Sequence, residues 1–173
     1  MTSFRDAVAA DLPAIDQVFR KSFCDTFAHL YRPEDLEAFL AQFTPAAWRG
    51  EFDDPRYRFR VAVVDEEVVG FLKLGPSALP IETDKRAIEL RQIYIRKQHH
   101  GSGIAAALTD WALDEARRQG FEEIYLTVYV DNHRARRFYD RYGFQQVGKY
   151  DFMVGNQADE DLILRHVIFQ KSA

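Results

Sequence analysis

Apolar side chains near the N-terminus of the 173-residue chain recur every three or four positions, which is the spacing of one face of an α-helix. Asp11 precedes this stripe and Pro13 falls in its first turn, a combination typical of a helix start. The stripe consists of Leu12, Ile15, Val18, Phe19 and Phe23. We therefore expect a helix that packs this face inward, after a short first strand at residues 3–8.

Two proline-containing segments predict further helix starts. In residues 32–35 (RPED) proline occupies the first helical position, and two acids lie at the positive end of the helix dipole. Residues 44–46 (TPA) repeat the signal on a smaller scale. We expect a second helix and then a short helical turn. Their apolar residues are Leu36, Phe39 and Leu40 in the helix, and Trp48 and Phe52 after it.

Runs rich in β-branched and aromatic residues predict strands in the middle of the chain. Residues 57–64 (YRFRVAVV) and 68–74 (VVGFLKL) flank the polar segment 65–67, as in a β-hairpin. Residues 87–95 (AIELRQIYI) follow as another strand. The loop after them opens a helix that we expect to end at Gly120.

The last third of the chain continues this alternation. Residues 124–130 (IYLTVYV) have a strand pattern, and Asn132 caps a helix that ends before Gly143. The crossover helix between the strands at 87–95 and 124–130 requires them to run in parallel. Strands near residues 145–152 and 161–169, joined by a turn at Gly155, complete an α/β fold.

Composition favours one globular domain that spans residues 1–173, because 47% of the residues are hydrophobic and 29% are charged. The net charge is −4 and the basic residues are scattered among acids, so nucleic acid is not an expected partner. Cys24 is the only cysteine, which excludes an intramolecular disulfide and a cysteine-rich metal site. With no leader pattern and no membrane-length apolar run, we expect a cytoplasmic protein without a membrane partner.

A glycine-containing loop between a predicted strand and a predicted helix carries the first chemical signal. Its residues are Gln98, His99, His100, Gly101, Ser102 and Gly103. Gly101 and Gly103 let the backbone approach an anion without a Cβ atom in the way, and the first amides of a helix lack intrahelical partners. A pyrophosphate fits such a helix end. Taken alone the pattern also describes an ordinary tight turn, and it lacks the features of a P-loop or a dinucleotide fingerprint.

This loop resembles the coenzyme-A loop of the GCN5-related N-acetyltransferases, written Gln/Arg-x-x-Gly-x-Gly/Ala, through Gln98, Gly101 and Gly103. A second block, residues 132–139 with Gly143-Phe144, is similar to the family's Asn-x-x-Ala-x-x-Phe-Tyr…Gly-Phe pattern. The order of elements matches over nearly the whole chain. The resemblance implies the family's acyl-CoA N-acyltransferase fold, a mixed and mostly antiparallel sheet whose splayed strands hold acetyl-CoA.

The resemblance also implies the cofactor-binding residues. Main-chain amides from Gln98 to Ile104 would hold the pyrophosphate, and the pantetheine arm would lie along the strand end. The residues concerned are Ile93, Tyr94, Ile95, Gln98, His99, His100, Gly101, Ser102, Gly103 and Ile104, with Asn132 and Tyr139 on the pantetheine and thioester side. No metal and no covalent enzyme intermediate are expected.

Two residues are the implied catalysts. Tyr139 would lie near the thioester sulfur, where its hydroxyl can protonate the departing thiolate. Glu89 occupies a position similar to that of the general base in some family members, and strand alternation would place it on one face with Arg91, Ile93 and Ile95. Alternative interpretations stay open. Tyr139 also fits a half-buried packing residue, and Glu89 also fits a solvated residue paired with Arg91.

Other motif residues can also be explained by structural roles alone. Asn132 suffices as a helix cap without any ligand, and both roles can coexist. The adjacent His99 and His100 also read as loop surface, since no partner completes a metal site. The arginines at 134, 136, 137 and 141 form a solvated helix face, or reach the phosphate of the cofactor's adenosine.

The acceptor is expected to be a small-molecule amine. Residues 31–40 (YRPEDLEAFL) and 152–164 (FMVGNQADEDLIL) resemble the corresponding stretches of bacterial polyamine acetyltransferases. This chain has Ala158-Asp159-Glu160-Asp161 where those proteins carry a Gln-Thr-Asp-like segment. Acetylation of a protein N-terminus or lysine, and a non-catalytic acyl-CoA-binding domain, are the alternatives. Dimers are common among relatives, so a homodimer is a further expectation.

Overall fold

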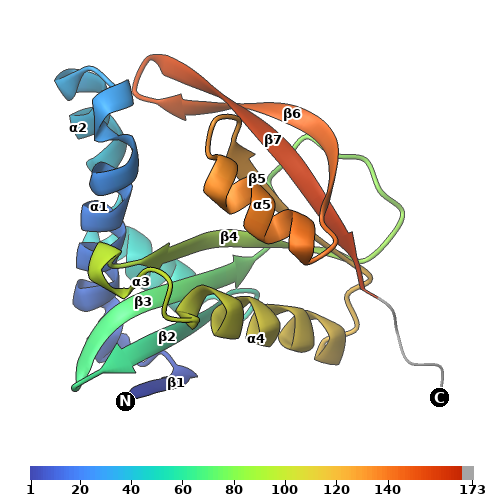
Figure 1. The fold of residues 1–173 in the computed structure, drawn as a ribbon, viewed down its shortest axis with the longest axis horizontal. Coiled ribbons are helices and arrows are strands. Elements are labelled where there is room, and N and C mark those ends of the chain that lie inside the picture. The colour runs from blue at the N-terminus through green and yellow to red at the C-terminus, as the bar shows by residue number, and fades with distance from the viewer. Residues whose placement is uncertain (169–173) are drawn as a thin grey trace.

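The computed structural model describes residues 1–168, which form one twisted sheet with helices on both faces (Figure 1). The strands are β1 (Thr2–Asp6), β2 (Arg58–Val64), β3 (Glu67–Gly75), β4 (Ala87–Ile95), β5 (Glu123–Tyr129), β6 (Gln145–Val154) and β7 (Gln157–Val167). The α-helices are α1 (Leu12–Phe27), α2 (Pro33–Leu40), α3 (Pro45–Asp53), α4 (Ile104–Arg118) and α5 (His133–Arg141). Short 3-10 turns η1 (Ala9–Asp11), η2 (Ala28–Leu30) and η3 (Lys97–His99) join some of them.

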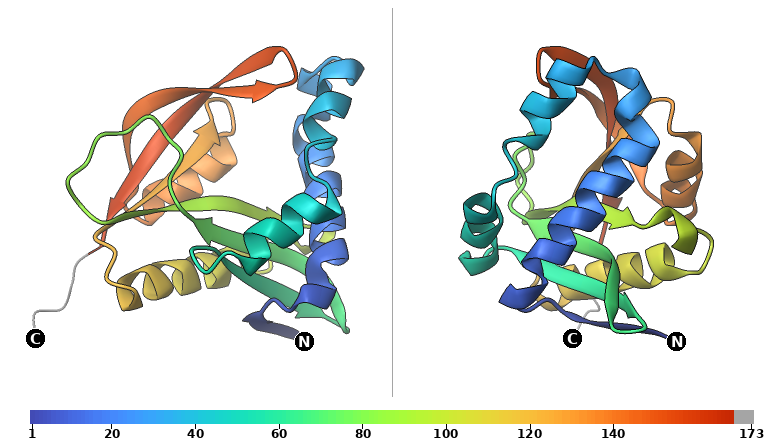
Figure 2. Two further views of the ribbon diagram at one scale, coloured as in Figure 1. Left: turned by 180° about the vertical axis from the view of Figure 1, so that it is seen from behind. Right: turned by 90° about the vertical axis from the view of Figure 1, so that its left-hand side faces the viewer.

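The seven strands lie in the order β1-β2-β3-β4-β5-β7-β6. Neighbouring strands are antiparallel except β4 and β5, which α4 connects and which run in parallel, as the sequence predicts. The mixed, mostly antiparallel sheet confirms the expected fold class. The long β6–β7 hairpin arches over one end of the molecule and reaches the N-terminal helices (Figure 2).

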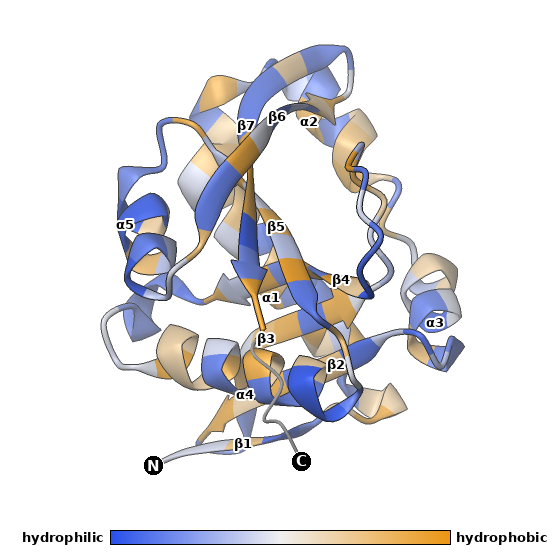
Figure 3. Cartoon of the chain, turned by 90° about the vertical axis from the view of Figure 1, so that its right-hand side faces the viewer, coloured by the Kyte–Doolittle hydropathy of each residue, from blue (hydrophilic) through white to orange (hydrophobic). Residues whose placement is uncertain are grey.

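Each face of the sheet has its own apolar core. Helices α1, α2 and α3 pack on one face through Phe19, Phe39 and Trp48. Helices α4 and α5 pack on the other, where Leu108 and Tyr139 contact the strands. Strand β3 is apolar along most of its length and is covered on both faces, whereas α5 is mostly hydrophilic (Figure 3).

Strands β4 and β5 separate soon after they meet. They pair only from Ala87 to Glu89 and from Glu123 to Tyr125, near the start of each strand. Beyond these positions β4 stays with β3 and β5 stays with β7. The sheet therefore opens between the carboxyl ends of two parallel strands, which is where α/β proteins commonly bind ligands.

A β-bulge in β4 changes which side chains share a face. Leu74 of β3 is opposite Leu90, but the preceding Lys73 is opposite Gln92, so Arg91 is the extra residue. As a result Leu90 and Ile93 face the same core. The expectation that Glu89 shares a face with Ile93 and Ile95 is therefore wrong, because simple alternation does not continue through a bulge.

Most predicted elements are confirmed, with shifts at their ends. The first strand covers residues 2–6 instead of 3–8, and the last begins at Gln157 instead of Asp161. The predicted end of that strand at Phe169 lies outside the described residues. The β2–β3 turn uses Asp65 and Glu66, both with positive φ, which gives a two-residue hairpin loop.

The tip of the β6–β7 hairpin is fastened to the N-terminal helices. Asn156 N–H donates to Asp35 Oδ1 (2.8 Å), and Arg32 N–H donates to Gln157 Oε1 (2.6 Å). Gly155 permits this approach, because a Cβ atom there would lie 2.6 Å from the Cα atom of Asp35. We call this set of contacts, made by Asp35, Arg32, Gly155, Asn156 and Gln157, the hairpin clasp.

Candidate active site

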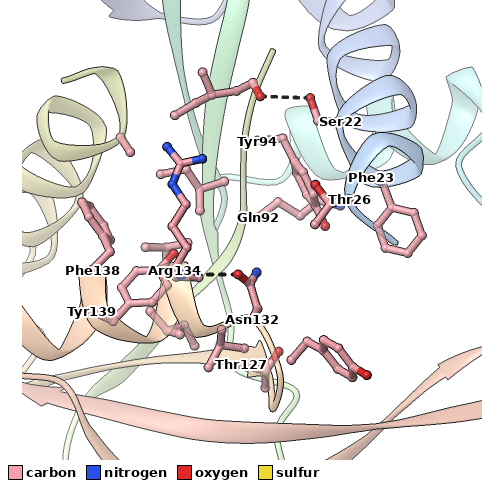
Figure 4. Close-up of a pocket in the computed structure, with 18 of the residues that line it drawn as sticks. Ser22, Phe23, Thr26, Gln92, Tyr94, Thr127, Asn132, Arg134, Phe138 and Tyr139 are labelled. Atoms are coloured by element: carbon pink, nitrogen blue, oxygen red, sulfur yellow. Dashed lines mark hydrogen bonds between the residues drawn. The ribbon is translucent and has the colours of Figure 1, made fainter. Parts of the chain in front are cut away.

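The opening between β4 and β5 continues into a cavity of about 710 Å³. Helix α1 supplies one wall through Ser22, Phe23 and Thr26, and α5 supplies the opposite wall through Phe138 and Tyr139 (Figure 4). The N-terminus of α4 and the β7 residues 159 and 161 lie at its margins. Every layer of the fold therefore contributes to this cavity.

The loop before α4 is shaped for an anion. Gly101 and Gly103 have φ of +78° and +85°, a left-handed conformation that favours glycine. The N–H groups of His99 and His100 are already bonded to Arg96 and Lys97. The first recorded hydrogen bond of α4 runs from the Ala107 N–H to the Gly103 carbonyl, so the amides from Gly101 into the first turn of α4 are available as donors. Of the predicted amide range of 98–104, the N–H groups of His99 and His100 are therefore engaged and those from Gly101 to Ile104 are available.

His100 joins this loop to β4 and α5. Its Nδ1 atom lies 2.9 Å from Arg134 Nη1, and its Nε2 atom lies 2.9 Å from the carbonyl oxygen of Ile95. Because a guanidinium can only donate, Nδ1 must accept, and Nε2 carries the proton that goes to Ile95. His100 is therefore a bridge, and its reading as plain loop surface is incomplete. Since Ser22 Oγ also donates to the Ile95 oxygen (3.3 Å), that carbonyl is already engaged.

Helix α5 begins at the cavity. Asn132 Oδ1 accepts from the N–H of Ala135 (3.3 Å), and the same residue lines the cavity, so the cap is confirmed and its side chain also faces the site. The arginines at positions 134, 137 and 141 line this side as well, whereas Arg136 donates to the Val130 carbonyl. The α5 side is consequently cationic.

Two phenols face the cavity, that of Tyr139, which is buried, and that of Tyr94, which is partly buried. Tyr139 is 6% exposed, and burial raises its pKa above the ordinary value. Burial also raises the pKa of Tyr94, and the nearby Asp161 and Tyr139 add to that effect. Both hydroxyls therefore hold their protons at neutral pH and can donate.

Glu89 lies where β4 and β5 still pair, outside the cavity wall. Its carboxylate accepts from the N–H of Ala78 (3.2 Å) and from Ser77 Oγ (3.4 Å), and its Oε2 lies 3.8 Å from Arg91 Nε. Burial raises the pKa of Glu89, while Arg91 and these donors oppose the shift. The residue therefore anchors the loop between β3 and β4.

The β7 side of the cavity is acidic. Asp159 and Asp161 are two residues apart on one strand, so both face the cavity. The hydroxyl of Tyr31 donates to Asp159 Oδ2. Burial and the neighbouring Asp159 raise the pKa of Asp161 to about 7, although Thr127 opposes the shift. The sequence shows this pair as Asp-x-Asp at strand spacing, a signal that our site prediction did not use.

The structure brings most of the predicted site residues together. Those on the cavity wall are Ile93, Tyr94, Ile95, His99, His100, Gly101, Gly103, Ile104, Asn132 and Tyr139. Gln98 and Ser102 belong to the same loop but lie outside the wall, as Glu89 does. Ser22, Thr26, Tyr31 and Gln92 were not predicted. They come from α1, from the connection between η2 and α2, and from the bulged strand β4, and their approach across the fold is not local in sequence.

Comparisons with known proteins agree with this architecture. The model of the Acetyltransferase (GNAT) family matches residues 18–144. An uncharacterized N-acetyltransferase of Lactobacillus delbrueckii subsp. lactis is 30% identical over 160 residues, which cover 91% of this chain and 92% of that protein. The chain therefore belongs to the GNAT acetyltransferase family.

Solved structures share the fold at low sequence identity. The PaiA N-acetyltransferase of Thermoplasma acidophilum, crystallised with coenzyme A, superposes with a TM-score of 0.75 at 21% identity and covers 96% of this chain and 99% of its own. The spermidine/spermine N-acetyltransferase SpeG of Vibrio cholerae gives 0.67 at 22% identity, with coverages of 96% and 95%. These likenesses establish the fold.

Two searches of residues 1–168 bear on other site types. Within that range, no cluster of three or more His, Cys, Asp or Glu side chains is placed to hold a metal ion. Among the helices of the same range, none is both long enough and apolar enough to cross a bilayer.

Proposed function

We infer that this protein transfers the acetyl group of acetyl-CoA to the primary amine of a small molecule, by direct attack in a ternary complex. The observation that carries the proposal is the cavity between β4 and β5, with unpaired helix amides at one end and a protonated tyrosine in its wall. Family membership supports acetyl transfer as the reaction.

The cofactor-binding residues fit coenzyme A. The amides from Gly101 onward and the dipole of α4 would hold its diphosphate. The side chains of Arg134, Arg137 and Arg141 are placed for the remaining phosphate. The pantetheine arm would then follow the free edge of β4 at Ile93 and Tyr94, in the manner of an added strand. Asn132 lies on the same side.

Acetyl-CoA supplies an activated carbonyl carbon with a thiolate as the leaving group. The ring of Tyr139 packs against Phe138 and Phe144, with centroids 5.2 and 5.5 Å apart. These contacts would hold the Tyr139 hydroxyl in place to donate its proton to the sulfur as the C–S bond breaks. The apolar wall around it excludes water from the departing group.

A coenzyme-A release assay tests the proposal. Purified protein and acetyl-CoA are incubated with spermidine, amino acids, an aminoglycoside and short peptides, and free thiol is measured. Release of coenzyme A that depends on a small amine supports the proposal. Release only with peptides would instead indicate that the acceptor is a protein. Stabilisation by acetyl-CoA without any release would instead indicate a binding module.

The proposal that the amine is a polyamine rests on the charge of the cavity. SpeG acts on spermidine and spermine by its name, and its likeness here is one of fold alone. Support within this chain comes from the acidic β7 side of the cavity, which suits a cation. A single domain over residues 1–173, a cytoplasmic location and a homodimer stay predictions of the sequence.

A further inference from the structure

The cavity has two ends of opposite charge. Arg134, Arg137 and Arg141 line the side formed by α5, near the unpaired amides of α4. Asp159 and Asp161 line the side formed by β7. If the cofactor's phosphates occupy the first end, as in the proposed function on which this inference rests, the second end faces the acceptor. An acceptor amine is an ammonium in water at neutral pH, so its charge matches that end.

Asp161 is buried and yet borders the cavity. It is 7% exposed and lies opposite Tyr129 on β5 and Tyr150 on β6. Among the ion pairs of residues 1–168, none involves Asp161, and its recorded partner is the hydroxyl of Thr127. A buried carboxylate without a cationic partner is costly, and an ammonium in the cavity would relieve that cost.

Asp159 differs from Asp161 in its partner. The hydroxyl of Tyr31 donates to Asp159, and this bond spans from the N-terminal helices to β7. The ring of Tyr31 is fixed by parallel stacking on Phe23 (centroids 6.0 Å apart). Asp159 is therefore held as an acceptor-only carboxylate, suited to binding a cation but already committed to one donor.

Aromatic rings surround the acidic pair. Phe27 meets Tyr129 edge to face, with centroids 6.1 Å apart, and both line the cavity together with Phe152. Ring faces attract organic cations and exclude water from the carboxylates. This end of the cavity thus combines the two features by which proteins recognise ammonium groups.

We propose that Asp161 is the general base of the transfer, that Asp159 binds the same ammonium, and that the acceptor is therefore a cationic primary amine entering from the β7 side. Glu89 is the competing candidate. Its carboxylate is engaged by Ala78 and Ser77 and lies outside the cavity wall, so it has no direct route to the amine.

The step balances as follows. An Asp161 oxygen takes one proton from the ammonium, and the freed lone pair forms the N–C bond at the acetyl carbon. The C–S electron pair goes to sulfur, which receives the proton of Tyr139 Oη. The nitrogen loses its second proton as the amide forms, and that proton restores Tyr139. Asp161 returns its proton to solvent, so one proton is released for each amide formed.

The electrostatics of the cavity suit this role. The pKa of Asp161 is raised to about 7, so the group is ionised over much of the neutral range and is more basic than an ordinary carboxylate. The negative charge of Asp159 contributes to the raised pKa of Asp161. The titratable groups that face the pair from the surrounding elements are Tyr31, Tyr94, Tyr129, Tyr139 and Tyr150.

The test compares four single variants in the coenzyme-A release assay, using spermidine or whichever panel amine the wild type acetylates fastest. They are Asp161→Asn, Asp159→Asn, Glu89→Gln and the control Glu160→Gln. Glu160 lies between the two aspartates but faces away and pairs with Lys149 at the surface. Each variant is assayed from pH 5.5 to pH 9.5, and its acetyl-CoA affinity is measured by calorimetry.

We expect kcat/KM of the wild type to rise tenfold per pH unit below an apparent pKa near 7, and Asp161→Asn to lower it about 100-fold at neutral pH. The inflection should disappear in that variant, and activity should then climb with pH towards the pKa of the amine. Asp159→Asn should mainly raise KM for the amine. Acetyl-CoA affinity should stay within about twofold in all four variants.

Two outcomes overturn the assignment. One is an Asp161→Asn variant with wild-type turnover and an unchanged pH profile. The other is loss of the inflection in Glu89→Gln alone. If the wild type releases no coenzyme A with any amine, the proposed function itself fails, and the inference fails with it.

Discussion

At the residue scale, the proposed chemistry depends on two side chains whose pKa values are raised by burial. Tyr139 and Asp161 lie across one cavity, and burial favours the neutral form of each. For the phenol this keeps the proton in place until a thiolate needs it. For the carboxyl of Asp161, the raised pKa makes the ionised form a stronger base towards an ammonium.

Replacing the Tyr139 hydroxyl should separate turnover from binding. Tyr139→Phe keeps the ring contacts and removes only the donor, so we expect kcat to fall about 100-fold while the affinity for acetyl-CoA stays the same. Steady-state kinetics and calorimetry measure the two quantities. Tyr142→Phe is the matched control, because Tyr142 is not part of the cavity wall and its hydroxyl bonds to the Ala106 carbonyl and to Asp110. Unchanged turnover in Tyr139→Phe would remove the acid role.

Asp161 should also affect stability in a predictable direction. Its folded-state pKa of about 7 lies above the unfolded value of 3.8, so the unfolded chain ionises first as pH rises between these values. The folded state binds more protons there, and its stability falls over that window. Asp161→Asn removes the penalty, so its stability relative to the wild type should increase from pH 4 to pH 8. Urea denaturation at both pH values measures this, and an equal difference at each would contradict it.

At the element scale, two glycines control the ends of the cavity. The conformation of Gly103 places the first amides of α4 at the proposed cofactor end, and Gly155 lets the β6–β7 hairpin approach α2. In the proposed function, each glycine supports one substrate site. Substitutions at the two positions should therefore affect different kinetic constants.

Gly103→Val should weaken acetyl-CoA binding. A β-branched residue at φ of +85° is strained, so the loop will shift and its amides will turn away. We expect the dissociation constant for acetyl-CoA to rise at least tenfold, measured by calorimetry. Gly50→Ala in α3 is the control, since a Cβ atom there meets nothing within 4 Å and alanine suits a helix. Normal binding by Gly103→Val would show that the loop is not the phosphate site.

Gly155→Ala should instead open the acceptor side. The added Cβ atom would clash with the backbone of Asp35 at 2.6 Å, so the hairpin clasp must loosen and Asp159 and Asp161 will move with β7. We expect KM for the amine to rise severalfold while KM for acetyl-CoA changes little. Two-substrate kinetics would contradict this if both constants rose together.

Local sequence patterns predicted the helices and strands, but they predicted only part of the candidate active site. Periodicity and caps located every α-helix and strand of residues 1–168, because those signals are short in range. The bulge at Arg91 was not predicted, since it depends on how β3 pairs with β4, and it reversed the face assigned to Glu89. Tyr31 and Asp159 are 128 positions apart, so their contact follows from tertiary structure alone.

At the scale of the whole molecule, ligand binding should stabilise the fold, because the cavity joins both cores. A ligand at one hundred times its dissociation constant adds about 2.7 kcal/mol, which for a chain of this size raises Tm by roughly 5–10 °C. We expect acetyl-CoA to produce such a shift in calorimetry, and adenosine alone to produce little. No shift at millimolar acetyl-CoA would exclude tight cofactor binding.

The short pairing of β4 with β5 leaves main-chain groups without strand partners along both inner edges. Water must solvate these peptide units when the cavity holds no ligand, and their protons should then exchange with deuterated solvent within seconds to minutes. The pantetheine arm of acetyl-CoA, lying in this gap, would supply hydrogen-bond partners to the free edge of β4. Slowed exchange at residues 92–94 and 127–129, with little change in β1 and β2, would mark the path of this arm along the sheet.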